Sequence, residues 1–396
     1  MTAERKAAAV RPFRIDIAQS DLEDLADRLA RTRFVPEIPG SNDFGVAARR
    51  VRSLVECWRN RYDWRAWEAL INIHPQFVTR IDGLDVHFLH VRSPAPNAFP
   101  LLLTHGWPMS IVEYLSVIGP LTDPRAHGRV GQAFDVVIPS IPGFGFSGPV
   151  LEPGWNRHRV ARAWAQLMDR LGYFRYGVHG NDVGAIISIE VGRVDPDRVA
   201  GVHVTQVFSL PSSDRRELAA MNDDDRDRVR RSEWFIRNKG AYLQLQSTQP
   251  QTLAHALGDS PVGQLAWNLQ LFGDDVTDDY VITNVMIYWL TNTAGTSAVT
   301  AYFEPGQAPR SPELTTTPLG VATFADDVFQ SVRPLAERDH RAITSWNVYG
   351  TGGHHAAHTV PGVLVDDIRR FFRPLLEGTS DDTSSSNGLA SAPAAS

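Results

Sequence analysis

Cysteine is nearly absent from this chain of 396 residues, in which Cys57 is the single example. One cysteine excludes an internal disulfide and any metal cluster held by cysteines, so we expect Cys57 to be a buried thiol. Lysine is also scarce, since it occurs only at Lys6 and Lys239 and arginine carries the other positive charges. We take this bias as a hint of a GC-rich coding sequence and not as a sign of function.

Long hydrophobic runs and a strong excess of one charge are missing too. No stretch approaches the roughly 18 apolar residues of a membrane-spanning helix. The first residues, Met1 to Lys6, lack the apolar core of a signal peptide. We therefore expect a cytoplasmic protein with no membrane partner. The formal net charge of -6 argues against nucleic acid as an obligatory partner.

The most informative stretch runs from Tyr176 to Ala185 and has Asp182 at its apex. It consists of an apolar strand, a turn between Gly180 and Gly184, and an apolar helix, which is the layout of a nucleophile elbow. Because a carboxylate forms an ester by displacement at an sp³ carbon, the predicted substrates are epoxides or alkyl halides and not peptides. An ordinary strand-to-helix turn is the structural alternative, because Gly, Asn and Asp are common in turns.

Apolar runs alternate with helical stretches on both sides of this turn, as at Pro100–Thr104 and Phe134–Ile138. This alternation predicts a doubly wound and mostly parallel sheet. Together with the elbow at Asp182, it indicates the α/β-hydrolase fold. The predicted divisions are a flexible arm (1–11), an N-terminal helical domain (12–80), the first part of the α/β-hydrolase core (81–210), an inserted helical lid (211–316), the second part of the core (317–377) and a disordered tail (378–396).

Local signals give further expectations for the N-terminal part. Ser20–Glu23 has the pattern of a capping box at the start of a helix, and Asp63 can cap a later helix. Residues Phe77–Val91 read as a hairpin with a tight Asp-Gly turn. Within it, we expect His87 and His90 to lie on the strand surface.

An ester on Asp182 needs groups that stabilise charge during its hydrolysis. Trp107 follows the first buried strand in the motif His-Gly-Trp-Pro, and Val183 follows Asp182. These are the positions at which this architecture builds an oxyanion hole from backbone N–H groups. An ordinary loop of Gly, Trp and Pro fits the first segment equally well.

Hydrolysis of the ester also needs a histidine base and a carboxylate that orients it. His354 and His355 follow the last predicted strand, and we favour His354 because it directly follows two glycines. Asp326 and Asp327 follow the preceding strand, and both are candidates for the carboxylate.

Opening an epoxide requires an acid for the leaving oxygen, and a lid tyrosine can supply it at neutral pH. Tyr242 and Tyr302 lie in the predicted lid, although packing is the alternative role for each. The lid also carries bulky aromatic residues, which suggest a bulky or aryl epoxide: Trp234, Trp267 and Trp289.

Eight short motifs stand out between Pro12 and Leu376: Tyr62–Arg65, Pro75–Phe77, Ile81–Leu84, His105–Pro108, Pro142–Ser147, Gly180–Gly184, Gln246–Thr252 and Gly352–His354. With these motifs, the chain resembles the microsomal-type epoxide hydrolases from about Pro12 to Leu376. The resemblance implies an N-terminal helical domain that wraps around the core and lid. It also implies these roles: Asp182 as nucleophile, His354 as base, Asp327 and not Asp326 as the charge-relay acid, and Tyr242 with Tyr302 as the lid pair.

Three departures from the family pattern stand out. The membrane-anchor helix of the mammalian enzymes is missing, His355 stands where phenylalanine is usual, and Asp327 stands where glutamate is common. The chain is also similar to bacterial epoxide hydrolases of enediyne antibiotic pathways.

The predicted function is that of an epoxide hydrolase without metal or cofactor, which converts an epoxide and water to a vicinal diol through a covalent Asp182 ester. The sequence leaves open whether the protein forms a homodimer. A haloalkane dehalogenase would share the Asp182 chemistry but needs halide-binding donors. A ligand-binding receptor on the same scaffold is the non-enzymatic alternative.

Overall fold

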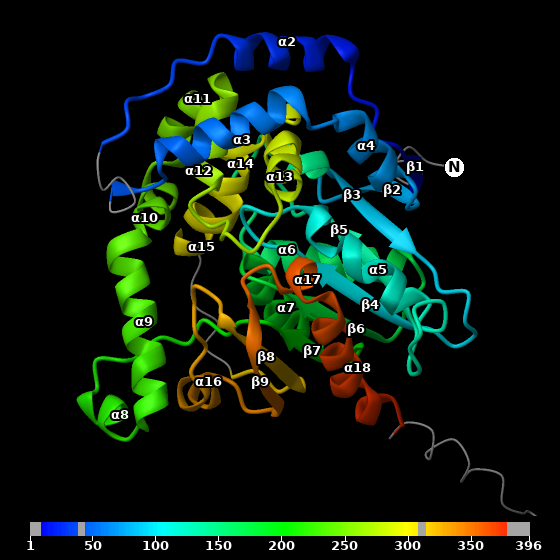
Figure 1. The fold of residues 1–396 in the computed structure, drawn as a ribbon. Coiled ribbons are helices and arrows are strands. Elements are labelled where there is room, and N and C mark those ends of the chain that lie inside the picture. Colours follow the sequence, from blue (N-terminus) through cyan, green and yellow to red (C-terminus); the bar gives the residue numbers. More distant parts are fainter. Residues whose placement is uncertain (1–8, 39–43, 308–313, 378–396) are drawn as a thin grey trace, which may run out of the picture.

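The computed structural model describes residues 9–38, 44–307 and 314–377 (Figure 1). The predicted tail (378–396) and all but the last three residues of the predicted arm (1–11) lie outside the described residues. Nine described strands form one sheet in the order β1-β2-β3-β5-β4-β6-β7-β8-β9. The strands are β1 (Arg11–Phe13), β2 (Gln76–Ile81), β3 (Leu84–Val91), β4 (Phe99–Thr104), β5 (Phe134–Pro139), β6 (Tyr176–Gly180), β7 (Val199–Val204), β8 (Leu319–Asp326) and β9 (Ile343–Gly353).

The sheet is parallel from β5 to β9 and antiparallel at the end that includes β1, β2 and β3. This is the mostly parallel α/β-hydrolase sheet that the sequence predicts. In the register, Thr104 of β4 lies opposite Gly180 of β6, and Gly180 lies opposite Val204 of β7. The loops that leave the carboxyl ends of these three strands therefore start side by side.

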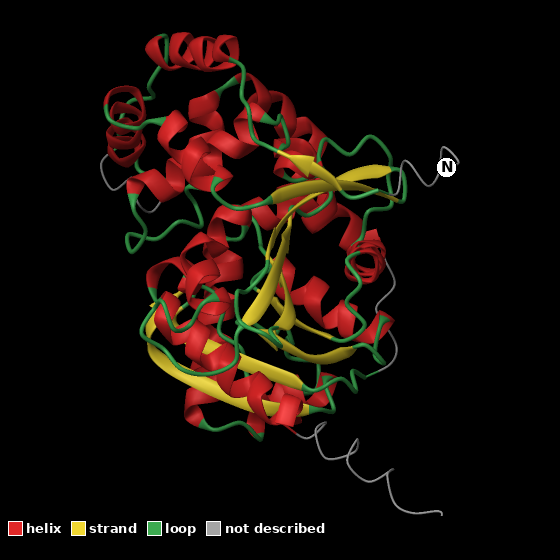
Figure 2. Ribbon diagram, turned by 90° about the vertical axis from the view of Figure 1, so that its right-hand side faces the viewer, coloured by secondary structure: helices red, strands yellow, loops and turns green. Residues whose placement is uncertain are grey.

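Helices cover both faces of the twisted sheet (Figure 2). Because successive side chains of a strand point to opposite faces, Leu101 and Leu103 pack in one hydrophobic cluster and Leu102 in another. Helices α5 (Leu115–Thr122) and α18 (Pro361–Glu377) contribute to the first cluster, and α6 (Arg157–Arg170) and α7 (Val183–Val194) to the second. Burial on both sides explains why these strands read as continuous apolar runs.

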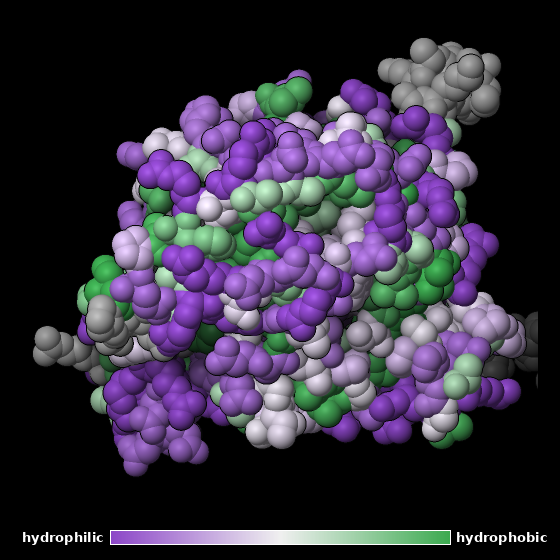
Figure 3. Space-filling view, turned by 45° about the horizontal axis from the view of Figure 1, so that its top comes forward, coloured by the Kyte–Doolittle hydropathy of each residue, from purple (hydrophilic) through white to green (hydrophobic). Residues whose placement is uncertain are grey.

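The N-terminal helices lie at one end of the molecule, beside helices of the lid (Figure 1). They are α2 (Gln19–Ala30), α3 (Ala48–Asn60) and α4 (Trp64–Asn72). Trp58 and Trp64 are buried there, and the indole N–H of Trp58 donates to the sulfur of Met286 at 3.2 Å. Both tryptophans therefore pack in the hydrophobic core. Seen from this end, the surface is mainly hydrophilic, with hydrophobic bands between the polar side chains (Figure 3).

The lid segment connects β7 to β8 and is helical in its described part. Its elements are α8 (Arg215–Ala219), α9 (Asp223–Lys239), α10 (Ala241–Thr248), α11 (Pro250–Asp259), α12 (Pro261–Asn268), α13 (Asp278–Leu290), α14 (Ala294–Ala298), the π-helical turn η4 (Val299–Phe303) and α15 (Glu304–Gln307). None of the described helices combines the length and the apolar character that crossing a bilayer needs.

Two local predictions for the N-terminal part are confirmed. The side chain of Asp63 caps α4 by accepting hydrogen bonds from the backbone N–H groups of Arg65 and Ala66. Asp82 and Gly83 turn the hairpin between β2 and β3 with positive φ angles of 48° and 82°. Such angles are those of the two-residue turns that match strand twist.

The predicted capping box at Ser20 is wrong. Helix α2 begins at Gln19, its N-cap is Ala18, and no side chain caps it. The chain just before the helix is held by a distant contact, because the backbone N–H of Ile17 donates to Glu68 at 2.8 Å. A tertiary hydrogen bond thus positions this helix start, where the local pattern predicted a serine cap.

The predicted surface position of His87 and His90 is also wrong. His87 is fully buried, and its ring nitrogens contact the hydroxyl of Ser140 and the amide oxygen of Gln76, each at 2.9 Å. His90 is buried as well and lies 2.8 Å from the hydroxyl of Tyr173. Both faces of β3 are covered, because Val86 and Phe88 pack in one hydrophobic cluster and Leu89 packs in the other.

Candidate active site

Asp182 lies at the apex of a sharp turn between β6 and α7, with φ of 52° and ψ of -124°. The turn is tight because glycines flank it at close backbone contacts. A Cβ at Gly180 would lie 2.2 Å from the carbonyl oxygen of Gly184, and a Cβ at Gly184 would lie 2.0 Å from that of Thr104. A non-glycine residue in such a conformation is strained by about 1–3 kcal/mol, which is typical of functional turns.

Two backbone N–H groups meet the Asp182 carboxylate. The N–H of Trp107 donates to its Oδ1 at 2.9 Å, and the N–H of Val183 also hydrogen-bonds to it. The ring Nδ1 of His105 lies 3.0 Å from the carbonyl oxygen of Gly106, and this contact orients the peptide unit that carries the Trp107 N–H. The two amides predicted from the sequence are therefore brought together at the carboxylate of Asp182.

His354 and Asp327 lie on the other side of Asp182. Nδ1 of His354 is 3.1 Å from Oδ1 of Asp327, and Nε2 of His354 is 3.9 Å from Oδ2 of Asp182. Both side chains are buried, and Nε2 of His354 has no hydrogen-bond partner among the described residues. The loops after β6, β8 and β9 thus place the nucleophile candidate, the carboxylate and the histidine in one row.

The neighbouring candidates from the sequence lie elsewhere. Asp326 is exposed, and His355 directs its Nε2 to the carbonyl oxygen of Leu271 at 3.1 Å. The ring of His355 stacks on Phe272 with 5.0 Å between the ring centres. The structure therefore brings His354 and Asp327 to Asp182 and keeps their sequence neighbours away from it.

Burial and charge act against each other in this row. Burial raises the pKa of Asp182, although the charge of His354 and the two amides oppose the rise. Burial by itself lowers the pKa of His354, but the carboxylate of Asp327, followed by that of Asp182, raises it to about 9. The two neighbouring carboxylates therefore outweigh burial at His354, and its imidazole binds a proton more tightly than a free imidazole does.

Both lid tyrosines contact the ring of Trp107, the residue whose backbone N–H binds Asp182. Tyr242 on α10 stacks on that ring at 5.4 Å, and Tyr302 on the turn η4 meets it edge to face at 5.6 Å. The two tyrosine rings lie 6.0 Å apart. The buried hydroxyl of Tyr302 has no hydrogen-bond partner among the described residues. Burial, and then the charge of Asp182, raises the pKa of both hydroxyls, so both keep their protons.

The three lid tryptophans have different surroundings. Trp234 is 56% exposed and lines a surface pocket of about 560 Å³ together with Phe235 of α9 and Val328, which follows Asp327. The indole N–H of Trp267 donates to Gln246 at 2.9 Å. Trp289 lies under the guanidinium of Arg28 on α2. Of the three, Trp234 is the one placed at this pocket.

Some residues at the site carry no signature in the sequence. Oε1 of Gln206 accepts the backbone N–H of Asp182 at 2.9 Å, and its amide nitrogen donates to Asp327. Strand β7 ends at Val204, so Gln206 lies in the loop that follows it. Glu113 and Asn181 form a second buried contact behind Asp182, with 2.8 Å between their side chains.

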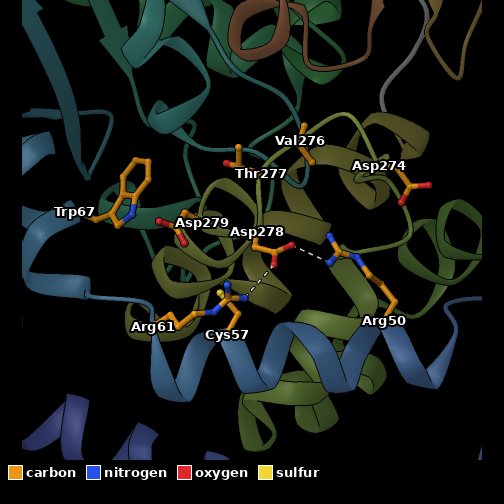
Figure 4. Close-up of a pocket in the computed structure, with 9 residues that line it drawn as sticks. All are labelled: Arg50, Cys57, Arg61, Trp67, Asp274, Val276, Thr277, Asp278 and Asp279. Carbon is orange, nitrogen blue, oxygen red and sulfur yellow. Dashed lines mark hydrogen bonds and ion pairs between the residues drawn. The ribbon is translucent and has the colours of Figure 1, made fainter.

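Another surface pocket, of about 870 Å³, lies between α3 and the loop before α13 and is separate from Asp182 (Figure 4). Its acidic residue Asp278 is paired with Arg50 at 2.8 Å and with Arg61 at 3.8 Å. Cys57 borders it and is buried, which raises the pKa of its thiol and confirms the expected role. Among the described residues, no group of three or more His, Cys, Asp or Glu side chains could hold a metal ion.

Comparison with known proteins gives consistent matches. Residues 10–114 match the family model "Epoxide hydrolase N terminus", and residues 100–256 match "alpha/beta hydrolase fold". A relative from Stigmatella aurantiaca is 39% identical over 92% of this chain and 85% of its own length. Epoxide hydrolase 1 of Sus scrofa is 32% identical over 93% of this chain and 90% of its own. The solved structure of the Aspergillus niger epoxide hydrolase is 27% identical and covers 93% of this chain and 97% of its own, with a TM-score of 0.83.

Proposed function

Since the chain belongs to the epoxide hydrolase family, we propose that it converts an epoxide to a vicinal diol in two steps, through a covalent ester on Asp182. The activity follows from the family. The residue roles are our proposal, and they rest on the row formed by Asp182, His354 and Asp327. The observation that carries them is the arrangement of the Asp182 carboxylate, whose Oδ1 accepts the backbone N–H of Trp107 while its Oδ2 faces Nε2 of His354.

In the first step, Oδ2 of Asp182 attacks a carbon of the epoxide ring, and the bond from that carbon to the epoxide oxygen breaks. Tyr242 and Tyr302 hydrogen-bond to this oxygen and supply its proton. Their raised pKa values keep both hydroxyls protonated and available as donors. Oδ1 becomes the carbonyl oxygen of the ester and stays in contact with the Trp107 amide.

In the second step, a water molecule attacks the carbonyl carbon of the ester. Nε2 of His354 takes a proton from this water, and Asp327 stabilises the imidazolium that forms. The charge that develops on Oδ1 is stabilised by the amides of Trp107 and Val183. Collapse of this intermediate breaks the bond between the ester carbonyl carbon and the oxygen joined to the former epoxide carbon. That oxygen takes the proton of the carboxyl group and leaves as the second hydroxyl of the diol, which restores the carboxylate of Asp182. The proton on His354 returns to the tyrosinate left by ring opening.

The trapped ester tests the two-step route. In H354Q the ring can still open but water is not activated, so one equivalent of substrate should remain bound as a mass adduct on the peptide that contains Asp182. H355Q is the matched control, because His355 points to Leu271. It should turn over within about threefold of the wild type. A folded H354Q that forms no adduct with a substrate of the wild type would contradict the covalent route.

We also propose a bulky or aryl epoxide as the substrate. The support is a surface pocket in which Trp234, Phe235 and Val328 offer apolar surface beside the charged side chains of Asp227, Arg230 and Arg231. W234A should raise KM for styrene oxide by about tenfold, and it should leave KM for the small propylene oxide unchanged. Equal effects on both epoxides would contradict a role in substrate binding.

The haloalkane dehalogenase alternative is superseded by the family. Unlike halide-binding donors, the lid tyrosines suit a leaving oxygen that stays attached to the product and needs a proton. Release of halide from bromoalkanes without turnover of any epoxide would reverse this conclusion.

A further inference from the structure

A buried carboxyl group that neither bonds to the substrate nor transfers a proton in the two steps lies directly behind Asp182. Glu113 belongs to the short 3-10 helix η2 (Ile111–Tyr114), and it is 1% exposed. Burial raises its pKa to about 8. A carboxyl group at such a position costs stability unless its hydrogen bonds are satisfied, so its partners indicate why it is there.

The two oxygens of Glu113 bind two different loops of the site. Its Oε2 accepts the backbone N–H of Gly106 at 3.2 Å, in the loop after β4 that carries the Trp107 amide. Its Oε1 accepts a hydrogen from the side-chain amide of Asn181 at 2.8 Å, in the elbow after β6. One carboxyl group therefore joins the oxyanion loop to the nucleophile turn.

Asn181 extends this connection to a third loop. Its amide nitrogen also donates to the backbone carbonyl oxygen of His354 at 2.9 Å, and its oxygen accepts the hydroxyl of Thr205. Both hydrogens and the oxygen of the Asn181 amide are thus used. The result is a chain of hydrogen bonds from Gly106 through Glu113 and Asn181 to His354.

The packing around this chain leaves little room for movement. A Cβ at Gly106 would lie 2.5 Å from Cβ of Asp182, so the oxyanion loop lies directly against the nucleophile. The helix that carries Glu113 is itself fixed, because Ser110 caps it and the hydroxyl of Tyr114 donates to the carbonyl oxygen of Thr104 at 2.9 Å. Glu113 is therefore a fixed point between the oxyanion loop and the nucleophile turn.

We propose that Glu113 is a positioning residue for hydrolysis of the ester: through Gly106 and Asn181 it holds the oxyanion loop and the His354 backbone in register with Asp182. The proposal rests on the two-step route above. The Trp107 amide stabilises an oxyanion only in the second step, and His354 acts as a base only there. Loss of their alignment should therefore slow ester hydrolysis much more than ring opening.

The test separates the two steps in single-turnover reactions quenched with acid, in which mass spectrometry follows the ester. In E113A, the rate constant for ester hydrolysis should fall by about tenfold to a hundredfold, as expected for a misplacement of about 1 Å. Ring opening should stay within about threefold. The ester should accumulate, and kcat and KM should fall together. E113Q keeps the volume and one acceptor oxygen, so it should recover part of the loss.

E68A is the matched control. Glu68 is also buried and also accepts a backbone N–H, that of Ile17, but it lies in the N-terminal segment. Its loss should change stability without changing the ratio of the two rate constants. If E113A does not fold, the same ratio measured for E113Q decides the question.

An unchanged ratio in a folded Glu113 variant would overturn the positioning role while leaving the two-step route intact. Absence of any ester in the wild type and in all variants would instead overturn the route itself, and this proposal with it.

Discussion

The two sides of the site differ in how their polar groups are occupied. On the sheet side, the loops after β4, β6, β7 and β9 are tied together by buried hydrogen bonds through Gln206, Asn181 and Glu113. On the lid side, Tyr242 and Tyr302 are placed by ring packing on Trp107, and the hydroxyl of Tyr302 has no partner among the described residues. One side is held by hydrogen bonds and the other by aromatic contacts.

This difference matches a division of labour between the two steps. Groups that must stabilise charge on an ester benefit from being fixed before the reaction starts. A hydroxyl that has no partner in the protein can bind the oxygen of an arriving epoxide without first breaking another hydrogen bond. We therefore expect the lid residues to govern ring opening and the sheet residues to govern hydrolysis.

The largest loss of rate should come from removing the hydroxyl groups of the lid pair, Tyr242 and Tyr302. Y242F and Y302F should each slow ring opening by about tenfold, and the double variant by about 10³-fold, because each hydroxyl partly covers for the other. Hydrolysis of the ester, once formed, should be unchanged. Y288F is the control, since Tyr288 donates to the carbonyl oxygen of Met109 at 2.8 Å. A double variant that slows hydrolysis and leaves ring opening intact would break the comparison.

A substitution on the sheet side should have a smaller effect, and it should slow ester hydrolysis instead of ring opening. D327N should slow ester hydrolysis by about a hundredfold, because the amide no longer stabilises the imidazolium of His354, and it should leave ring opening nearly unchanged. D326N offers a neighbouring control with an exposed side chain. Equal losses in D326N and D327N, read from single-turnover rates, would show that the choice between the two aspartates is wrong.

The pH dependence of hydrolysis should sharpen this result. The base must be neutral, so the rate should rise with pH up to the pKa of His354, which is about 9 when Asp182 is ionised. Esterification removes the charge of Asp182, so the midpoint for hydrolysis should lie below 9 and should fall further in D327N. Quenched single-turnover reactions between pH 6 and 10 measure this midpoint. A rate that falls as the pH rises over this range would contradict His354 as the base.

The sequence predicted those parts of the site that depend on neighbouring residues. Asp182 could be found because Gly180 and Gly184 permit the turn, and both glycines lie within two residues of it. The tight turn at Asp82 and the cap at Asp63 are equally local. The strands of the core were found because burial on both faces makes them continuously apolar.

Contacts between distant residues could not be predicted in this way. Glu113 binds Asn181 across 68 positions, and Asn181 binds the His354 carbonyl across 173. No spacing or local pattern marks such a pair. The burial of His87 and the start of α2 were missed for the same reason, because His87 contacts Ser140 and the chain before α2 contacts Glu68, each more than 50 positions away.

Several statements about the setting of the enzyme stay predictions. They are the cytoplasmic location, the bacterial source, the assignment to an antibiotic pathway and the homodimer. The domain boundaries taken from the sequence also stay predictions, although the described lid helices do lie between β7 and β8.

The most direct test of the account is a single turnover of styrene oxide by excess enzyme in ¹⁸O-labelled water, with the diol analysed by mass spectrometry. The account predicts an unlabelled diol in the first turnover, because the added oxygen comes from the carboxylate of Asp182. A labelled diol from the first turnover would mean that water attacks the epoxide directly, and it would contradict the covalent route.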